Sequence, residues 1–251
     1  MDATRKFDGR ARNYTASRPS YARALIEHLY SRYGISAASV IADIGSGTGK
    51  FAKHLLDKGS KVYCVEPNAD MRRVAEEELS TYRNFYSVLG TAEHTTLEEA
   101  SVDHITAAQA FHWFDGNTFK QECLRIIKEG GRVFLVWNIR RDDDPLNQEL
   151  HQIYSVYCPD FKGFSGGIRR DDQRILDFFD GQYECAAFEP PRPLNRKRFL
   201  ARSLSGSYSL KAGDDQYEAY ITSLNAAFDK YKNDGIVTIA NQSVAYCGII
   251  R

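Results

Sequence analysis

Residues 40–49 read Val40-Ile41-Ala42-Asp43-Ile44-Gly45-Ser46-Gly47-Thr48-Gly49, an apolar run that leads into a glycine-rich turn. An apolar run bounded by glycines is typical of a strand in a parallel sheet that is covered on both faces. Gly45 and Gly47 carry no Cβ, so the backbone can turn sharply there and a ligand can lie directly against it. Residues 48–58 then predict a helix whose N-terminus faces the same crevice. The stretch therefore predicts a strand, a turn and a helix with a ligand at the turn.

The spacing of these glycines separates three classes of cofactor. A phosphate-binding P-loop ends in Gly-Lys-Ser/Thr, but here Gly49-Lys50 is followed by Phe51. The dinucleotide fingerprint Gly-x-Gly-x-x-Gly has its third glycine where this chain has Lys50, a long charged side chain. The P-loop interpretation therefore fails, whereas the dinucleotide interpretation is weakened and stays open.

Size and composition limit the kinds of partner. The 251 residues suffice for one large α/β domain, and lysine plus arginine (33) equals aspartate plus glutamate (33), so no basic excess is available to follow a nucleic-acid backbone. No apolar run reaches the roughly 18 residues of a membrane span, and the N-terminus lacks a signal peptide's apolar stretch. Five widely spaced cysteines and six histidines show no metal-ligand spacing. We therefore expect a cytoplasmic monomer or homodimer that binds a small molecule, with no metal, nucleic acid or membrane.

Strands and helices alternate over the first half of the chain. Residues 61–65, 86–90 and 133–137 predict further apolar strands, and another begins at residue 101. Helices are predicted over 20–34, from Asp70 onward, and over 115–128, where Gly130-Gly131 would end the last one. This alternation predicts a doubly wound α/β fold with a parallel sheet.

An acidic residue follows the second predicted strand, in Glu66-Pro67-Asn68. One carboxylate can accept hydrogen bonds from both hydroxyls of a ribose, and a position about 20 residues after the glycine turn is typical of that role. Nicotinamide and adenosylmethionine sites share such an acid, so Glu66 does not choose between them. Met71, in the next helix, is either a surface for adenine or part of the core.

The segment after the fourth predicted strand is rich in aromatic residues and reads Ala108-Gln109-Ala110-Phe111-His112-Trp113-Phe114. Loops at the carboxyl ends of parallel strands line the crevice of an open α/β sheet, so these side chains should face the ligand. His112 is the one histidine placed where a base is needed, and an imidazole suits proton removal at neutral pH. Packing within the aromatic run is the alternative role for His112.

Two of these stretches resemble a known family. Asp-x-Gly-x-Gly-x-Gly after the first strand resembles motif I of the class I S-adenosylmethionine-dependent methyltransferases. Residues 108–114 resemble the segment after the fourth strand of small-molecule methyltransferases, and Tyr14 and Arg18-Pro19 are similar to a stretch before the first helix in the trans-aconitate type. The resemblance implies that S-adenosyl-L-methionine is the cofactor. It implies cofactor contacts from Tyr14, Arg18, Asp43, Gly45, Ser46, Gly47, Glu66, Pro67, Met71, Ala92, Glu93, Gln109 and Ala110.

The family resemblance also implies an architecture. It predicts a mainly parallel seven-stranded sheet, Rossmann-like, with an antiparallel last strand and a partly helical cap. We expect one domain over 1–251, with an arm and first helix at 1–34, a cofactor-binding core at 35–138, a cap with one sheet strand at 139–234, and C-terminal strands at 235–251. A lid over the cofactor and a plain surface arm are the two alternatives for the N-terminal arm. Arg169 and Arg170 in the cap are candidates to bind an acceptor carboxylate or are ordinary surface arginines.

The predicted activity is in-line transfer of a methyl group from S-adenosylmethionine to a small carboxylate, phenol or amine. Such an enzyme works largely by positioning, because the methyl donor is already activated. A phenol or amine acceptor would use His112 as base, and a carboxylate would need none. An NAD(P)-dependent oxidoreductase and a non-catalytic adenosylmethionine-binding protein are the alternatives.

Overall fold

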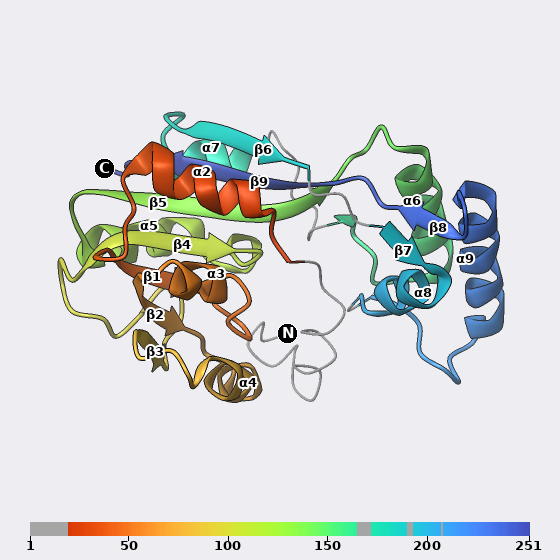
Figure 1. Ribbon diagram of the computed structural model, residues 1–251, viewed down its shortest axis with the longest axis horizontal. Helices are drawn as coiled ribbons and strands as arrows, with labels where there is room; N and C mark the ends of the chain where they lie inside the picture. Colours follow the sequence, from red (N-terminus) through yellow and green to blue (C-terminus); the bar gives the residue numbers. More distant parts are fainter. Residues whose placement is uncertain (1–19, 165–171, 190–192, 207) are drawn as a thin grey trace.

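The computed structural model describes residues 20–164, 172–189, 193–206 and 208–251 (Figure 1). The strands are β1 (Val40–Ile44), β2 (Lys61–Val65), β3 (Phe85–Val88), β4 (Val102–Ala108), β5 (Ile127–Arg140), β6 (Glu184–Phe188), β7 (Pro193–Asn195), β8 (Ile236–Thr238) and β9 (Asn241–Gly248). The helices are α2 (Arg23–Tyr33), α3 (Ala52–Asp57), α4 (Ala69–Leu79), α5 (Gly116–Ile126), α6 (Pro145–Tyr157), α7 (Gln173–Phe178), α8 (Arg196–Leu204) and α9 (Tyr217–Tyr231).

Seven strands form one sheet in the order β3-β2-β1-β4-β5-β9-β6. The pairs among β1 to β5 are parallel, whereas β9 runs antiparallel to both β5 and β6. The strand order reverses between β1 and β4. In open α/β sheets, ligands bind in a crevice at such a reversal, outside the carboxyl ends of the strands. The predicted mainly parallel sheet with an antiparallel last strand is therefore confirmed.

Helices cover both faces of the sheet and create two buried cores (Figure 1). On one face, Leu25 and Leu29 of α2 and Leu55 of α3 pack with residues such as Ile41 and Val136. On the other face, α5 and α7 contribute a second cluster, in which the Phe119 and Phe178 rings stack with centroids 5.4 Å apart. The sheet is thus buried on both sides, which explains the continuous apolar sequence of β1.

A third hydrophobic cluster lies outside the sheet. It joins α6, α8 and α9 to the small antiparallel sheet of β7 and β8, with Tyr154, Phe199, Tyr220 and Phe228 among its buried members. This cap lies beyond the end toward which β4 points, at the right of Figure 1. The cap therefore stands at the edge of the sheet where the ligand crevice is expected.

The structure differs from the sequence expectations at several element ends. The helix predicted to reach residue 128 ends at Ile126, because Ile127 is already extended and pairs with Val102 as the first residue of β5. Strand β5 therefore runs through Gly130 and Gly131 rather than starting after them. Residues 236–238 form β8 and pair with β7 of the cap, so only β9 of the two C-terminal strands joins the main sheet.

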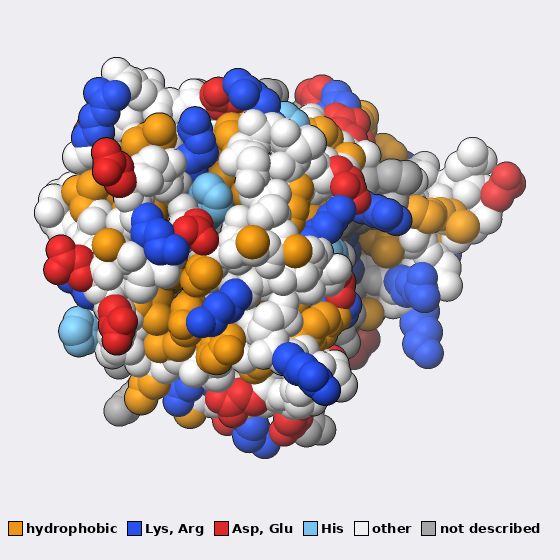
Figure 2. All heavy atoms as spheres, turned by 60° about the vertical axis from the view of Figure 1, so that its left-hand side comes forward, with side chains coloured by type: hydrophobic (Ala, Val, Ile, Leu, Met, Phe, Trp, Pro, Cys, Tyr) orange, Lys and Arg blue, Asp and Glu red, His pale blue; other side chains and the backbone are white. Residues whose placement is uncertain are grey.

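The surface carries both charges in mixed order. On the face drawn in Figure 2, Lys and Arg side chains alternate with Asp and Glu side chains rather than gathering in one patch. This mixture agrees with the equal numbers of basic and acidic residues in the sequence. In the part of the chain that the structure describes, we find no helix of the length and apolarity that a bilayer crossing requires.

Candidate functional site

The turn after β1 is held against the end of β2. The backbone N–H groups of Gly45 and Ser46 both donate to the Val65 carbonyl, at 2.9 and 3.2 Å. Gly45, Gly47 and Gly49 have φ angles of +65°, +57° and +75°, a region that side chains with a Cβ disfavour. The glycine pattern of the sequence is thus explained by the path of the backbone.

The space around the first two glycines differs. A Cβ placed on Gly45 would lie 2.8 Å from the Ala110 Cβ, so the turn and the loop after β4 are in close contact there. A Cβ placed on Gly47 would have no atom within 4 Å. The turn therefore packs against protein at Gly45 and faces open space at Gly47, where a ligand can approach the backbone.

Glu66 connects this turn to the start of α4. One of its carboxylate oxygens accepts the Gly47 N–H and the other accepts the Asn68 N–H, both at 2.9 Å. The residue is 8% exposed, and burial raises the pKa of the Glu66 carboxyl, while the two N–H groups and Arg72 act in the opposite direction. Arg72 also donates to the Glu66 and Pro67 carbonyls, which fixes the loop that carries the acid.

Asp43, at the end of β1, is almost completely buried beneath the turn. One of its oxygens accepts the Thr106 hydroxyl at 2.7 Å. The other makes no hydrogen bond of regular geometry with a described residue, although the Ala52 N–H lies near the carboxyl. Burial raises the pKa of Asp43 to about 7, against the opposing effect of the Thr106 hydroxyl and the Ala52 N–H. The Asp43 carboxyl can therefore change its charge near neutral pH.

Further polar atoms at the turn have no hydrogen-bond partner within the described ranges. They are the buried hydroxyl oxygens of Ser46 and Thr48, in addition to the second oxygen of Asp43. Buried polar atoms are normally paired, and those left without partners call for an explanation. Together with the open space at Gly47, they fit a polar ligand with hydrogen-bonding groups.

The loop after β4 brings the predicted aromatic segment to the same edge. Gln109 has a φ of +56° and is fixed by two bonds, from its N–H to the Val136 carbonyl at 2.8 Å and from its Nε2 to the Asn138 carbonyl at 3.2 Å. A residue other than glycine in this conformation is strained, and such strain is common at functional sites. Residues 111–113 form a 3₁₀ turn, in which the His112 ring lies 4.7 Å from the Trp113 ring.

The other predicted residues that the structure describes lie around this edge. Ala92 and Met71 are buried, and the Met71 N–H donates to the side chain of Asn68, the N-cap of α4. Glu93 accepts the backbone N–H of Asp115, the N-cap of α5, at 3.1 Å. Glu93 therefore has a structural contact of its own.

Sequence reasoning missed several residues that position the site. Thr106, Asn68 and Arg72 hold the two acids, and Asn138 binds Gln109 through its carbonyl. The contacts of Thr106 and Asn138 depend on neighbouring strands, whereas Asn68 and Arg72 make local contacts in the loop after β2 and the first turn of α4. Asn68 before an acidic first turn was visible as a helix cap. Tyr14, Arg18, Arg169 and Arg170 lie outside the described residues.

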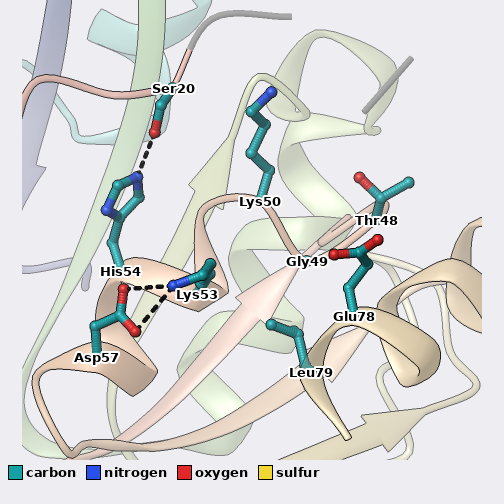
Figure 3. A pocket seen from close by; sticks show the side chains of 9 residues that line it. All are labelled: Ser20, Thr48, Gly49, Lys50, Lys53, His54, Asp57, Glu78 and Leu79. Atoms are coloured by element: carbon teal, nitrogen blue, oxygen red, sulfur yellow. Dashed lines mark hydrogen bonds and ion pairs between the residues drawn. The ribbon is translucent and has the colours of Figure 1, made fainter. Parts of the chain in front are cut away.

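A hollow of about 380 Å³ opens on the outer flank of the glycine turn (Figure 3). Thr48, Gly49 and Lys50 line it from the turn, and side chains of α3 and α4 together with Ser20 line the rest. The Ser20 hydroxyl lies 2.7 Å from Nε2 of His54, and burial lowers the pKa of that imidazole. Neither Asp43 nor Glu66 is among the lining residues, so this hollow lies away from the side of the turn on which those two acids lie.

Residues 42–135, which contain the turn, both acids and the loop after β4, match the model of a methyltransferase domain family. This segment is therefore similar to a methyltransferase domain. An uncharacterized methyltransferase of Mycobacterium tuberculosis (strain H37Rv) is 35% identical over 152 residues, or 61% of this chain and 60% of that protein. An uncharacterized methyltransferase-like protein of Schizosaccharomyces pombe is 31% identical over 153 residues, covering 61% of this chain and 59% of that one. The chain thus spans about 60% of the length of the curated relatives that it matches.

Solved structures show the same fold around this domain. A putative type II methyltransferase from Anaeromyxobacter dehalogenans has a TM-score of 0.66 at 21% identity and covers 92% of this chain and 97% of its own. The YcgJ protein from Bacillus subtilis has a TM-score of 0.60 at 20% identity, with 92% and 99% covered. The fold is therefore that of the class I methyltransferases, as the sequence resemblance implied.

Proposed function

We propose that the protein is an S-adenosylmethionine-dependent methyltransferase that acts on a small molecule. The observation that carries the proposal is the placement of Glu66 within the methyltransferase domain. Its carboxylate lies against the Gly47 N–H, beside open space over the turn. That is the arrangement of an acid for ribose hydroxyls next to a backbone that a ligand can touch.

The chain's own polar atoms fit the two ends of this cofactor. Glu66 would accept the ribose hydroxyls, because each of its oxygens has a lone pair beyond the backbone bond that it already accepts. The second oxygen of Asp43 and the Ser46 hydroxyl, which make no hydrogen bond of regular geometry with a described residue, would bind the amino acid end near Gly47. When bound, the cofactor supplies an activated methyl group on a cationic sulfonium. The Phe114 ring lies next to Gly45 and would offer an aromatic surface to that cation.

The cap and the composition support a small acceptor. The cap lies beyond the carboxyl ends of the strands, where it can enclose a compact molecule and exclude water (Figure 1). The balanced charge offers no broad basic surface of the kind that nucleic acids require. A cytoplasmic location is part of the same proposal, supported by five cysteines that are all free thiols.

His112 is the proposed base for acceptors that must lose a proton. It is carried by the turn after β4, next to the strained Gln109 and within the aromatic segment. A carboxylate acceptor needs no base, so the effect of His112→Gln on turnover depends on the acceptor. Unchanged turnover of a phenol or amine by that variant would reject the assignment.

Calorimetric titration tests the cofactor directly. We expect S-adenosylhomocysteine to bind and NADH not to bind. Glu66→Gln should weaken S-adenosylhomocysteine by roughly 10- to 100-fold, since hydrogen bonds to a charged group contribute about 1.5–3 kcal/mol. Glu184→Gln, at an exposed acid of β6, is the control and should bind like the unmodified protein. Binding of NADH, or an unchanged affinity in Glu66→Gln, contradicts the proposal.

Transfer of a labelled methyl group separates an enzyme from a binding protein. A panel of small carboxylic acids, phenols and amines is incubated with protein and methyl-labelled S-adenosylmethionine. Labelled product that requires the protein and is reduced in Glu66→Gln is the expected result. Tight cofactor binding without any product across the panel would favour the non-catalytic alternative.

A further inference from the structure

Two adjacent arginines at the end of β5 have very different surroundings. The Arg141 guanidinium is paired with the carboxylates of Asp143 and Glu189, at 2.9 Å from its Nε and 3.3 Å from its Nη1. Arg140 is half-buried and forms no ion pair in the part of the chain that the structure describes, and its buried Nη1 has no hydrogen-bond acceptor there. A buried cationic donor without an acceptor is costly, so Arg140 requires an explanation.

Aromatic rings of the cap hold the Arg140 guanidinium in place. Its central carbon lies 4.1 Å from the centre of the Phe164 ring and 6.0 Å from that of Tyr154. Such contacts stabilise a cation but leave its N–H groups free to donate to a coplanar anion. Tyr154 is itself completely buried, and its hydroxyl has no partner among the described residues.

A second unpartnered donor lies directly beside Arg140. Asn241 of β9 is opposite Arg140 in the antiparallel pairing of β5 with β9, so the two side chains lie on the same face of the sheet, with Cβ atoms about 5 Å apart. Asn241 is 4% exposed, and its Nδ2 has no acceptor within the described ranges. Arg140, Asn241 and Tyr154 thus place three polar groups together, and no carboxylate of a described residue accepts from them.

The position of this cluster connects it to the candidate site. Arg140 follows Asn138 by two residues on the same face of β5, and the Asn138 carbonyl accepts the side chain of Gln109. The cluster therefore lies where the carboxyl edge of the sheet meets α6 of the cap. An acceptor held between the sheet and the cap, where we place it, would meet these side chains at that junction.

We propose that Arg140, Asn241 and Tyr154 form a subsite for a carboxylate group of the methyl acceptor, with Phe164 as an apolar wall. The guanidinium fork matches the two oxygens of a carboxylate, and the Asn241 amide and Tyr154 hydroxyl supply further donors. The inference rests on the proposed function, because it names the acceptor class of the same site.

Benzoate and its neutral analogue benzamide test this subsite. Binding of each is measured by calorimetry, with and without saturating S-adenosylhomocysteine, so that failure to bind S-adenosylhomocysteine refutes the proposed function separately. We expect benzoate to bind at least about tenfold more tightly than benzamide. Arg140→Met should weaken benzoate by about tenfold or more, and the matched control Arg141→Met should change its binding by less than about twofold.

Asn241→Asp provides an independent variant. A carboxylate at that position would face Arg140 and occupy the subsite from within, so we expect loss of benzoate binding together with a higher thermal midpoint. The proposal is overturned if the unmodified protein does not bind benzoate. It is also overturned if Arg140→Met or Asn241→Asp binds benzoate as tightly as the unmodified protein does. Weaker S-adenosylhomocysteine binding by Arg140→Met with unchanged benzoate binding also overturns it, because the guanidinium would then hold the donor's own carboxylate.

Discussion

A carboxyl group buried at the end of a central strand is costly to ionise, and Asp43 is in that position. It is 1% exposed, and its pKa of about 7 lies far above the ordinary value of 3.8 because of burial. The folded state therefore holds a proton on Asp43 that the unfolded chain releases above about pH 4. Stability gained from this proton is fully present at low pH and is lost as the pH rises toward 7.

Asp43→Asn should remove this pH dependence. An amide of the same shape does not titrate, so the free energy of unfolding of the unmodified protein, relative to the variant, should fall by roughly 4 kcal/mol between pH 4 and pH 8. Urea unfolding at a series of pH values measures the difference.

Asp103 gives a control with the opposite sign. Burial raises its pKa, but Lys128 and the Val40 N–H outweigh that effect and lower it below 3.8. The stability that Asp103 contributes is present above about pH 4 and lost below it. Asp103→Asn should therefore shift stability by a constant amount between pH 5 and pH 8. A flat difference for Asp43→Asn over the same range would show that Asp43 is already ionised in the folded protein.

The turn between β1 and α3 is the element on which the cofactor proposal depends. Gly47 and Gly130 have similar left-handed conformations, with φ of +57° and +77°, and both would place a new Cβ in open space. Alanine at either position should cost about 1–2 kcal/mol of stability through backbone strain alone. Only the Cβ at position 47 would lie where we place the ligand.

Gly47→Ala should therefore weaken S-adenosylhomocysteine binding by at least about tenfold, while Gly130→Ala should leave it unchanged. Calorimetry gives the affinities, and urea unfolding confirms that the two variants lose similar stability. Equal affinities in the two variants would place the cofactor elsewhere.

The observed bounds of strands and helices agree with the predicted ones where residues nearby in the sequence determine them. Strands β1 and β2 have the predicted bounds, since an apolar run ended by glycine or by Glu66-Pro67 specifies them. The predicted end of α5 was wrong, because Ile127 pairs with Val102 in the sheet and the helix therefore ends before Gly130-Gly131. Strand β8 pairs with a short segment more than 40 residues earlier, and no local pattern identifies such a partner.

The candidate site likewise combines contacts that the sequence predicts with contacts that only the folded sheet creates. The sequence singled out Glu66 and Gly47 as neighbours in function, and the structure joins them by a hydrogen bond. The Thr106 hydroxyl on Asp43 and the pairing of Arg140 with Asn241 arise from neighbouring strands. Their residue types alone carry no signal of these contacts, so sequence reasoning could not find them.

The whole molecule contains separate hydrophobic cores, and we expect each core to lose its structure independently when it is destabilised. Phe228 is 1% exposed in the cap, where its ring lies 5.4 Å from that of Phe199. Phe228→Ala should cost about 3–5 kcal/mol and increase hydrogen exchange mainly in α6, α8 and α9. Cofactor affinity should change by less than about threefold, whereas methyl transfer should fall, because the acceptor loses its enclosure.

Phe119→Ala is the matched change in the sheet core, since Phe119 packs against Phe111, Phe114 and Phe178. It should increase exchange in α5, α7 and β4 and weaken S-adenosylhomocysteine as well. Identical exchange patterns in the two variants would show that the cap and the sheet unfold as one cooperative unit.

The insertion of β9 between β5 and β6 has a consequence for synthesis on the ribosome. β6 pairs with no strand except β9 among the described residues, and β9 follows the end of β5 by about 100 residues. At elongation rates of about 5–20 residues per second, one edge of β5 stays unpaired for roughly 5–20 s in each nascent chain. During that interval the apolar edge from Val133 to Trp137 is accessible to chaperones and to other nascent chains, so translation speed over the cap should affect the yield of folded protein.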